Sequence, residues 1–383
     1  GQPSEALQGF MRGAGITVEQ LERIDTPTGE WLVYRKTIAG QALSALLPSL
    51  LQESLNALPI AKRMRSAASR TEFVRPVQWL VCLLGRDIIA LHRFGLTASN
   101  VSFGHRFHAP HAITLNSPAD YEPALQNAFV QADFAARREK IRAGILAKAA
   151  ELGGTAKISE ELLDEVTALV EHPVVIAGNI EPRFLALPPE VIVATVETNQ
   201  RYFTVFNGTQ LLPFFITVSN IASQDMQQVV TGNERVVRPR LSDALFFWEQ
   251  DQKQPLAAFR ERLNTITFQK DLGSVGDKVV RVIKFLSAPN KPNTTGIPKN
   301  HPTALQAAAL CKNDLVTRMV FEFPELQGLM GEHYARLSGH SDDVATAIAQ
   351  HYQPTQAGGA IPSTQAGQLL ALADKLDTIC GIF

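Results

Sequence analysis

Residues 201–221, RYFTVFNGTQLLPFFITVSNI, contain the strongest fold signal in the 383-residue chain. Two runs rich in aromatic and β-branched residues flank Asn207-Gly208, a dipeptide typical of tight β-hairpins. The stretch 172–180, HPVVIAGNI, has the composition of a buried strand and comes shortly before the hairpin. We therefore expect an antiparallel sheet built around residue 207.

Towards the N-terminus, helical and strand patterns alternate, which predicts an α+β domain over residues 1–222. Ser159 and the acids that follow it are typical of a helix start. A short helix is expected from Pro188-Pro189-Glu190. The other predicted elements are helices at 4–14, 40–57 and 118–151, a strand at 31–38, and a hairpin of 76–85 with 88–95.

Strand signals vanish after Ile221, and the remaining residues have helical patterns. We expect residues 223–302 to form a helical connecting region that ends in an exposed loop, 287–302, rich in Pro, Asn and Gly. Residues 303–383 are expected to form a second domain. The predicted fold class is thus α+β, with an antiparallel-sheet domain followed by an all-helical domain.

The stretch 231–251, TGNERVVRPRLSDALFFWEQD, lies where the two patterns meet. Leu241, Leu245 and Trp248 have the spacing of one apolar helix face, and Pro239 with its neighbouring arginines is expected at the helix start. The arginines either pair with nearby acids or form a basic surface for phosphates, and spacing alone favours pairing. The arginines are Arg235, Arg238 and Arg240, and the acids within reach are Glu234, Asp243 and Glu249.

The overall composition is that of a soluble globular protein, with 45% hydrophobic and 19% charged residues. The net charge of −1 means that any nucleic-acid surface must be a local patch. No apolar run approaches the ~18 residues of a membrane span, so a cytoplasmic protein is expected.

Cys82, Cys311 and Cys380 fit no zinc or disulfide pattern and are expected to be buried thiols. The first and last residues suggest a piece of a longer protein.

Three further stretches hold candidate site residues, each with two interpretations. The basic run 62–76, which includes Arg70 and Arg75, is either a phosphate-binding segment or a solvated loop. The histidines of 104–111 suggest zinc, but Gly104 and Pro110 favour a loop around one hydrogen-bonded histidine. The stretch 197–203, which includes Arg201, can read a base edge or hold a carboxylate, although a local cap network is favoured.

Asp314 and Asp374 are expected near each other on facing helices. Phosphohydrolases of the histidine–aspartate (HD) class hold a divalent metal with a His-Asp pair and a later aspartate. Asn313 stands where that pair has its histidine, so most of a hydrolytic site is missing. The alternative is a helical bundle in which the aspartates are caps or ion-pair partners. We predict no bound metal and no catalytic residue in this chain.

Ten colinear motifs, from about residue 5 to the last residue, resemble the bacterial glycyl-tRNA synthetase beta subunit family. They include ASRTEFVRPVQWLVCLLG, VEHPVVIAG, NQRYFTVF, GNERVVRPRLSDALFFWEQD, DLVTRMVFEFPELQGLMGEHYA and ALADKLDTICGIF. One departure is KRMRSAASR, where the family usually has Trp-Gly after the arginine. The resemblance implies that residues 1–222 are similar to the editing domain of the phenylalanyl-tRNA synthetase beta chain. It also implies that 303–383 are similar to HD domains.

The same resemblance implies a heterotetramer of two alpha and two beta chains. The alpha chain would hold glycine, ATP and magnesium, and the beta chain would bind glycine tRNA without being catalytic alone. A metal-dependent HD-type phosphohydrolase or editing deacylase is one alternative, and a structural scaffold for the alpha dimer is another. With tRNA as the partner, six arginines become candidates for phosphate contacts or for a domain interface: Arg70, Arg75, Arg201, Arg235, Arg238 and Arg240.

Overall fold

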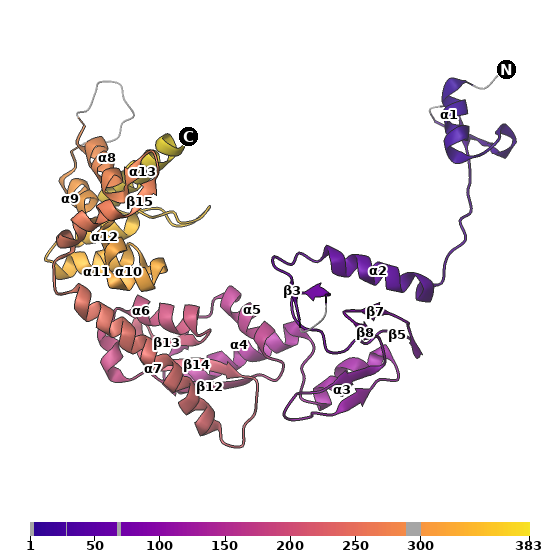
Figure 1. The fold of residues 1–383 in the computed structure, drawn as a ribbon, viewed down its shortest axis with the longest axis horizontal. Helices are drawn as coiled ribbons and strands as arrows, with labels where there is room; N and C mark the ends of the chain where they lie inside the picture. The colour runs from indigo at the N-terminus through magenta and orange to yellow at the C-terminus, as the bar shows by residue number, and fades with distance from the viewer. Residues whose placement is uncertain (1–3, 28, 67–69, 289–299) are drawn as a thin grey trace. The chain divides into compact units, whose positions relative to one another are not determined.

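The computed structural model describes residues 4–27, 29–66, 70–288 and 300–383 (Figure 1). Contacts divide the chain into two compact units. The first unit contains the residues up to Ser102 together with Ala112–Tyr121, and the second contains Phe103–His111 and Glu122–Phe383. These units do not follow the ranges 1–222, 223–302 and 303–383, which stay a prediction. Residues 289–299 of the expected exposed loop lie outside the described part of the chain.

The first unit combines two helices with short strands, and its core cluster is small. Cys82, Ile89 and Leu91 are buried, and α2 packs Leu47 and Leu51 against them. The predicted helices are confirmed as α1 (Glu5–Ala14) and α2 (Leu43–Ala57). The strands are β1 (Glu22–Thr26), β2 (Gly29–Val33), β3 (Met64–Arg65), β4 (Glu72–Phe73), β5 (Leu83–Leu84), β6 (Asp87–Ile88), β7 (His92–Arg93), β8 (Leu96–Thr97), β9 (Val101–Phe103) and β10 (Ala112–Thr114).

The strands predicted for this unit were too long. The hairpin at Gly85 forms, but β5 and β6 pair over only two residues each. The strand expected at 31–38 ends at Val33. Trp79 and Ile88 are only partly covered within this unit, with exposed fractions of 41% and 51%. Strand-like composition here gave short pairings rather than a longer sheet, because strand formation depends strongly on packing context.

The second unit contains the predicted antiparallel sheet. Its strand order is β11-β13-β14-β12. The hairpin at Asn207-Gly208 is confirmed, and Gly208 has a φ of 59°, which glycine adopts without strain. The strands are β11 (Thr155–Ala156), β12 (Val174–Asn179), β13 (Phe203–Asn207) and β14 (Gln210–Ser219).

Each face of this sheet packs on a separate core. Phe203, Val205 and Ile216 point to one face, where α4 and α5 cover them. Phe215 points to the opposite face and belongs to a larger core that also contains α6 and α7 residues. Its ring lies across Gly178 on the neighbouring strand, and a Cβ there would come within 2.3 Å of the ring. Glycine is therefore required at 178 for the phenylalanine to lie flat.

The helix predicted for 118–151 is interrupted and forms α3 (Tyr121–Asn127) and α4 (Phe134–Glu151). The break occurs because Phe129 adopts a left-handed conformation and Asp133 caps the new helix by accepting from Ala136 N. The helix start at Ser159 is confirmed in α5 (Glu160–Leu169), as is the short helix α6 (Pro189–Val193).

The helix expected to start near Pro239 begins earlier, so α7 runs from Met226 to Asp251. Asp225 caps its N-terminus by accepting from Gln228 N. Pro239 is therefore inside the helix, which removes one backbone donor. Packing of Val237 and Leu241, on both sides of the proline, holds the helix together across it.

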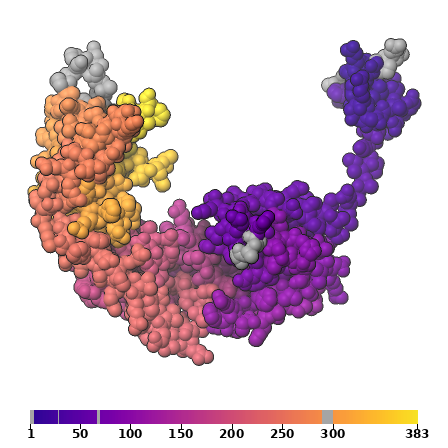
Figure 2. Space-filling view, in the orientation of Figure 1, coloured from indigo at the N-terminus to yellow at the C-terminus, as the bar shows by residue number. Residues whose placement is uncertain are grey.

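The remaining residues are mainly helical, although β15 (Thr267–Gln269) and β16 (Gly273–Ser274) form a small strand pair that the sequence analysis missed. One hydrophobic core continues from Ile180 and Phe215 through α7 into these helices. In the space-filling view the surface of α7 adjoins that of the helices that follow it (Figure 2). The helical elements are η5 (Leu256–Thr265), α8 (Val275–Ser287), α9 (Pro302–Leu310), η6 (Asn313–Val316), α10 (Arg318–Glu322), η7 (Pro324–Leu326), α11 (Leu329–Leu337), α12 (Asp342–Gln350) and α13 (Gln365–Ile382).

Two expectations from composition concern membranes and thiols. Among the described residues, no helix is long and apolar enough to cross a bilayer. Cys82 and Cys311 are buried as expected, and burial raises the pKa of the Cys311 thiol to about 12. Cys380 is exposed, so the prediction was wrong there. It lies in the last turns of α13, beyond Ala373, the last buried residue of that helix.

Candidate nucleic-acid interface

The apolar face of α7 fixes the position of this helix. Leu241 and Ala244 are fully buried, and Leu245 and Trp248 pack against the same core while partly exposed. The Trp248 ring stacks on Tyr334 with 5.2 Å between centroids. Burial of such side chains contributes about 1.5–3 kcal/mol each. The packing of the apolar face therefore determines which surface the arginines of α7 occupy.

Arg235, Arg238 and Arg240 are all exposed. Arg238 forms an ion pair with Glu181, which also pairs with Arg183. Glu181 is therefore the partner of Arg238, rather than one of the acids expected from helical spacing. Burial opposes ionisation of Glu181, but Arg238 and Arg183 hold the pKa of its carboxyl below the usual value.

Glu234 faces β12 instead of the arginines. Its carboxylate accepts from the backbone N and the side-chain Nδ2 of Asn179, both at 2.8 Å. This contact joins α7 to the end of the strand. Glu234 and Arg238, one helical turn apart on α7, thus both contact the end of β12 and the segment that follows it.

The other arginine candidates do not join this surface. Arg201 has a left-handed backbone with a φ of 61°, and its Nε donates to Glu165 Oε1 at 2.6 Å. It therefore holds a carboxylate of α5. Arg70 and Arg75 are exposed but belong to the first compact unit. Four of the six candidates thus share the second unit, and only the three on α7 share one element.

The histidine stretch 104–111 is a loop, as predicted, but two of its histidines are hydrogen-bonded rather than one. His105 is buried, and its Nε2 donates to Asn220 O at 2.6 Å. Its Nδ1 accepts from the backbone N of Phe107 and of His108, both at 3.2 Å. His108 Nε2 in turn accepts from Ala222 N. These rings hold the loop against the segment that connects β14 to α7.

Asn313 and Asp314, which were compared with the His-Asp pair of HD enzymes, are completely buried, but not on one long helix. The chain from 311 to 335 is divided among η6, α10, η7 and α11, because Pro324 and the positive φ of Gly328 interrupt it. Asp314 Oδ2 accepts from Gly328 N at 2.5 Å and from Gly331 N at 3.1 Å. This aspartate therefore stabilises the turn that leads into α11.

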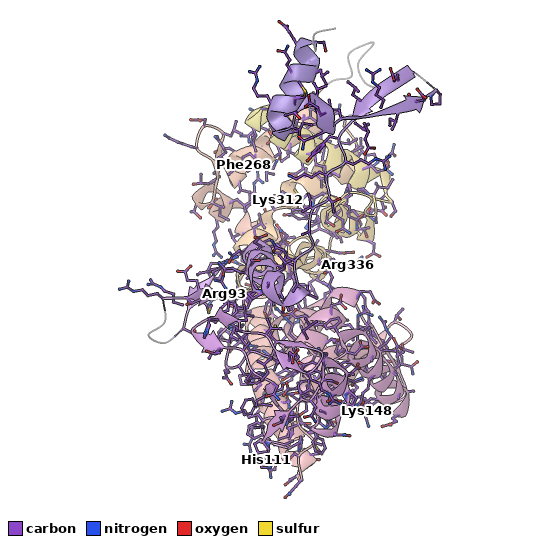
Figure 3. The ribbon with its side chains drawn as sticks, turned by 90° about the vertical axis from the view of Figure 1, so that its right-hand side faces the viewer. Arg93, His111, Lys148, Phe268, Lys312 and Arg336 are labelled. Carbon is purple, nitrogen blue, oxygen red and sulfur yellow. The ribbon has the colours of Figure 1, made fainter. Side chains whose placement is uncertain are left out.

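Asp374 is surrounded by ammonium groups that sequence analysis missed. Lys278 Nζ lies 3.3 Å from Asp374 Oδ1, and Lys312 Nζ lies 3.4 Å from Asp374 Oδ2. Lys312 belongs to the helical part (Figure 3) and lies 3.9 Å from the centroid of the Tyr352 ring. Burial works against ionisation, but Lys312 and Lys278 keep the pKa of Asp374 below its usual value.

One sequence signal pointed to this cluster. Lys278 follows Val275 by three residues and precedes Val282 by four, which places a charge on the buried face of α8. Among the described residues, no group of three or more histidine, cysteine or acidic side chains is arranged to hold a metal ion. Both aspartates instead have protein partners.

Asp314 predicts a pH effect on stability. Burial raises the pKa of its carboxyl to about 6, against the opposing hydrogen bonds from Gly328 and Gly331. The folded chain therefore holds this proton more tightly than the unfolded chain. The contribution of protonated Asp314 to the free energy of unfolding is present at low pH and is lost as pH rises through about 6. Relative to Asp314→Asn, we expect the native protein to lose roughly 3 kcal/mol of unfolding free energy between about pH 4 and pH 7.

Urea unfolding of both proteins across this range measures the difference. Asp343→Asn, an exposed aspartate of α12, is the matched control and should parallel the native protein at every pH. Parallel curves for Asp314→Asn would show that burial does not shift the Asp314 pKa.

Comparison with known proteins agrees with the resemblance seen in the motifs. Residues 1–383 match the family model described as glycyl-tRNA synthetase beta subunit. The chain is 50% identical to a glycine–tRNA ligase beta subunit of Acinetobacter baylyi, 48% to one of Chromohalobacter salexigens and 47% to one of Hahella chejuensis. Each alignment covers the whole chain and 55% of the relative.

The chain thus spans about half the length of the curated relatives that it matches. A family match over every residue, together with about half of all positions identical, shows that the chain belongs to the glycyl-tRNA synthetase beta subunit family.

Proposed function

We propose that this chain is the tRNA-binding part of the beta subunit of a glycine–tRNA ligase. In this role it supports the ATP-dependent attachment of glycine to its tRNA, which the alpha subunit carries out. The observation that carries the proposal is the family match along residues 1–383. The relatives are named as subunits of a ligase, and a ligase that charges tRNA must hold a polyanion.

The electrostatics of the second unit support this proposal. The net charge of the chain is −1, so RNA affinity must come from a local surface. The exposed arginines of α7 provide such a surface, because a packed helix holds them on one rigid element. Of the six candidates, we assign the phosphate contacts to Arg235, Arg238 and Arg240, because these three share one helix, whereas Arg201 lies outside α7.

The proposal extends to partners and cofactors. The assembly is a tetramer of two alpha and two beta chains in the cytoplasm, and it binds glycine tRNA. ATP and magnesium bind to the alpha subunit. The chain alone is therefore expected to give no glycine-dependent exchange between ATP and pyrophosphate.

Arg238→Ala tests the RNA role of α7. We expect weaker binding of glycine tRNA and a slope of log affinity against log salt that is smaller by about 0.9, because one phosphate contact is lost. The melting temperature should stay nearly unchanged, since the Arg238–Glu181 pair is solvent-exposed. Titrations at several salt concentrations and a thermal melt measure both quantities.

Lys270→Ala is the matched control, because it removes an exposed charge outside α7. We expect this variant to keep the tRNA affinity and the salt slope of the native protein. An unchanged salt slope with a lowered melting temperature for Arg238→Ala would assign Arg238 to packing between the sheet and its neighbours rather than to RNA.

A further inference from the structure

A groove of about 860 Å³ lies at the C-terminal end of α7. The end of α7, the segment η5, and the stretch from η6 to α10 form its walls. None of the six candidate arginines lines this groove. It belongs entirely to the second compact unit.

Three phenylalanines line the groove. Phe259 is buried and Phe247 is partly buried, whereas Phe321 on α10 is 82% exposed. Phe323, two residues later, is buried in the core. A single exposed phenylalanine is ordinary on a protein surface. Phe321, however, stands beside two other rings in a hollow, where a planar apolar ligand can stack.

Three cations surround these rings. Lys253, Arg262 and Arg318 line the groove and are exposed, and none forms an ion pair within the described residues. The Arg262 guanidinium lies 5.8 Å from the centroid of the Phe259 ring. Because Phe259 is itself buried, its ring holds the Arg262 side chain in place, and the guanidinium can bind a phosphate while a base stacks on the exposed ring of Phe321.

The acids of the groove oppose this charge only weakly. Asp251 is turned inward, and its oxygens accept from Arg318 N, Met319 N and Tyr334 OH, each at 3.0 Å. Glu322 is the other acidic side chain of the lining. Lys253 Nζ donates to the neutral Gln250 Oε1 at 2.8 Å, so its charge is not neutralised. The charged side chains left to meet a ligand are therefore three cations and one acid, together with exposed aromatic surface.

We propose that this groove binds unpaired nucleotides of an RNA, with a base stacked on Phe321 and phosphates bound by Arg262, Arg318 and Lys253. This inference rests on the proposed tRNA-binding function and adds a second contact to the arginines of α7. Bases in a duplex are stacked inside the helix and present no free face to a ring, whereas unpaired bases do. The aromatic lining therefore selects single-stranded segments.

The test compares Phe321→Ala with Phe246→Ala in the whole protein. Phe246 is also an exposed phenylalanine, but it does not line the groove. Each variant is titrated with a short unstructured single-stranded RNA, with an RNA duplex and with glycine tRNA. We expect Phe321→Ala to weaken single-strand binding roughly five- to 150-fold and to leave duplex binding unchanged. Phe246→Ala should bind all three as the native protein does.

A charge variant provides an independent measurement. Arg318→Gln keeps the backbone donor to Asp251 and should reduce the single-strand salt slope by about 0.7. Lys284→Gln, an exposed cation of α8 outside the groove, should leave that slope unchanged. Unaltered melting temperatures exclude misfolding as the cause.

The other outcomes overturn the proposal. If Phe321→Ala binds single-stranded RNA and tRNA as the native protein does, the groove is not an RNA-binding site. This conclusion holds even if Arg238→Ala still weakens tRNA binding. An equal loss of affinity for the duplex and for the single-stranded RNA would contradict selection of unpaired bases. Loss of alpha-subunit association with RNA binding intact would make the groove a protein interface. Absence of tRNA binding in the native protein would instead contradict the proposed function itself.

Discussion

Lys278→Met should lower the free energy of unfolding by about 3–5 kcal/mol, because it removes one charge from a buried ionic cluster. The Lys278 ammonium donates to Asp374 O at 2.9 Å and to Thr378 Oγ1 at 2.7 Å, and it lies 3.3 Å from the Asp377 carboxylate. Its side chain is 5% exposed, so water cannot replace the lost partner. Methionine fills a similar volume but leaves the carboxylates with one cation fewer.

Lys284→Met is the matched control for this prediction. Lys284 lies on the same helix but is exposed and faces solvent, so its replacement should change stability little. Chemical unfolding of both variants measures the difference. Equal stability of the two variants would show that Lys312 and Arg281 neutralise Asp374 and Asp377 without Lys278.

Asp251→Ala is expected to lower the free energy of unfolding by a similar amount, about 3–5 kcal/mol. Its carboxylate is the acceptor for the first two backbone N–H groups of α10 and for the Tyr334 hydroxyl. Alanine leaves these donors unpaired, and those of Met319 and Tyr334 are buried. Burial and the neighbouring Asp251 raise the pKa of Tyr334, so the phenol stays protonated and continues to need an acceptor.

Asp243→Ala, an exposed aspartate on the same helix, should be close to neutral. A calorimetric melt of the two variants compares them directly. A near-neutral Asp251→Ala would indicate that water enters the groove and pairs with the donors left by the carboxylate.

Local signals predicted the elements of the second unit well where turn and cap chemistry was explicit. Asn207-Gly208 located the hairpin, and Ser159 located the start of α5. The same reasoning failed where a distant contact decided the outcome. Pro239 looked like a helix start, but the core residues on both sides of it keep α7 continuous. In the first unit, strand-like composition gave pairings such as that of β5 with β6, which extends over only two residues of each strand.

The candidate site was predicted less completely than the fold. The arginines of α7 were found from clustering, but Glu181, the partner of Arg238, lies 57 residues away in the chain and has no local signal. Helical spacing instead suggested nearby acids, of which Glu234 contacts Asn179. The groove at the end of α7 is formed by two stretches of the chain, 247–266 and 315–322, so no pattern in either one alone indicates a hollow.

The core that continues from the sheet into the helices means that the chain is not modular at residue 222. Cutting there would expose Phe215 and Val191 on one piece and Leu241 on the other, all of which are fully buried in the intact protein. Two such pieces would each have an adhesive apolar face and would aggregate or reassociate. Exchange of segments between relatives should therefore succeed only when the sheet, α7 and the helices that follow are inherited together.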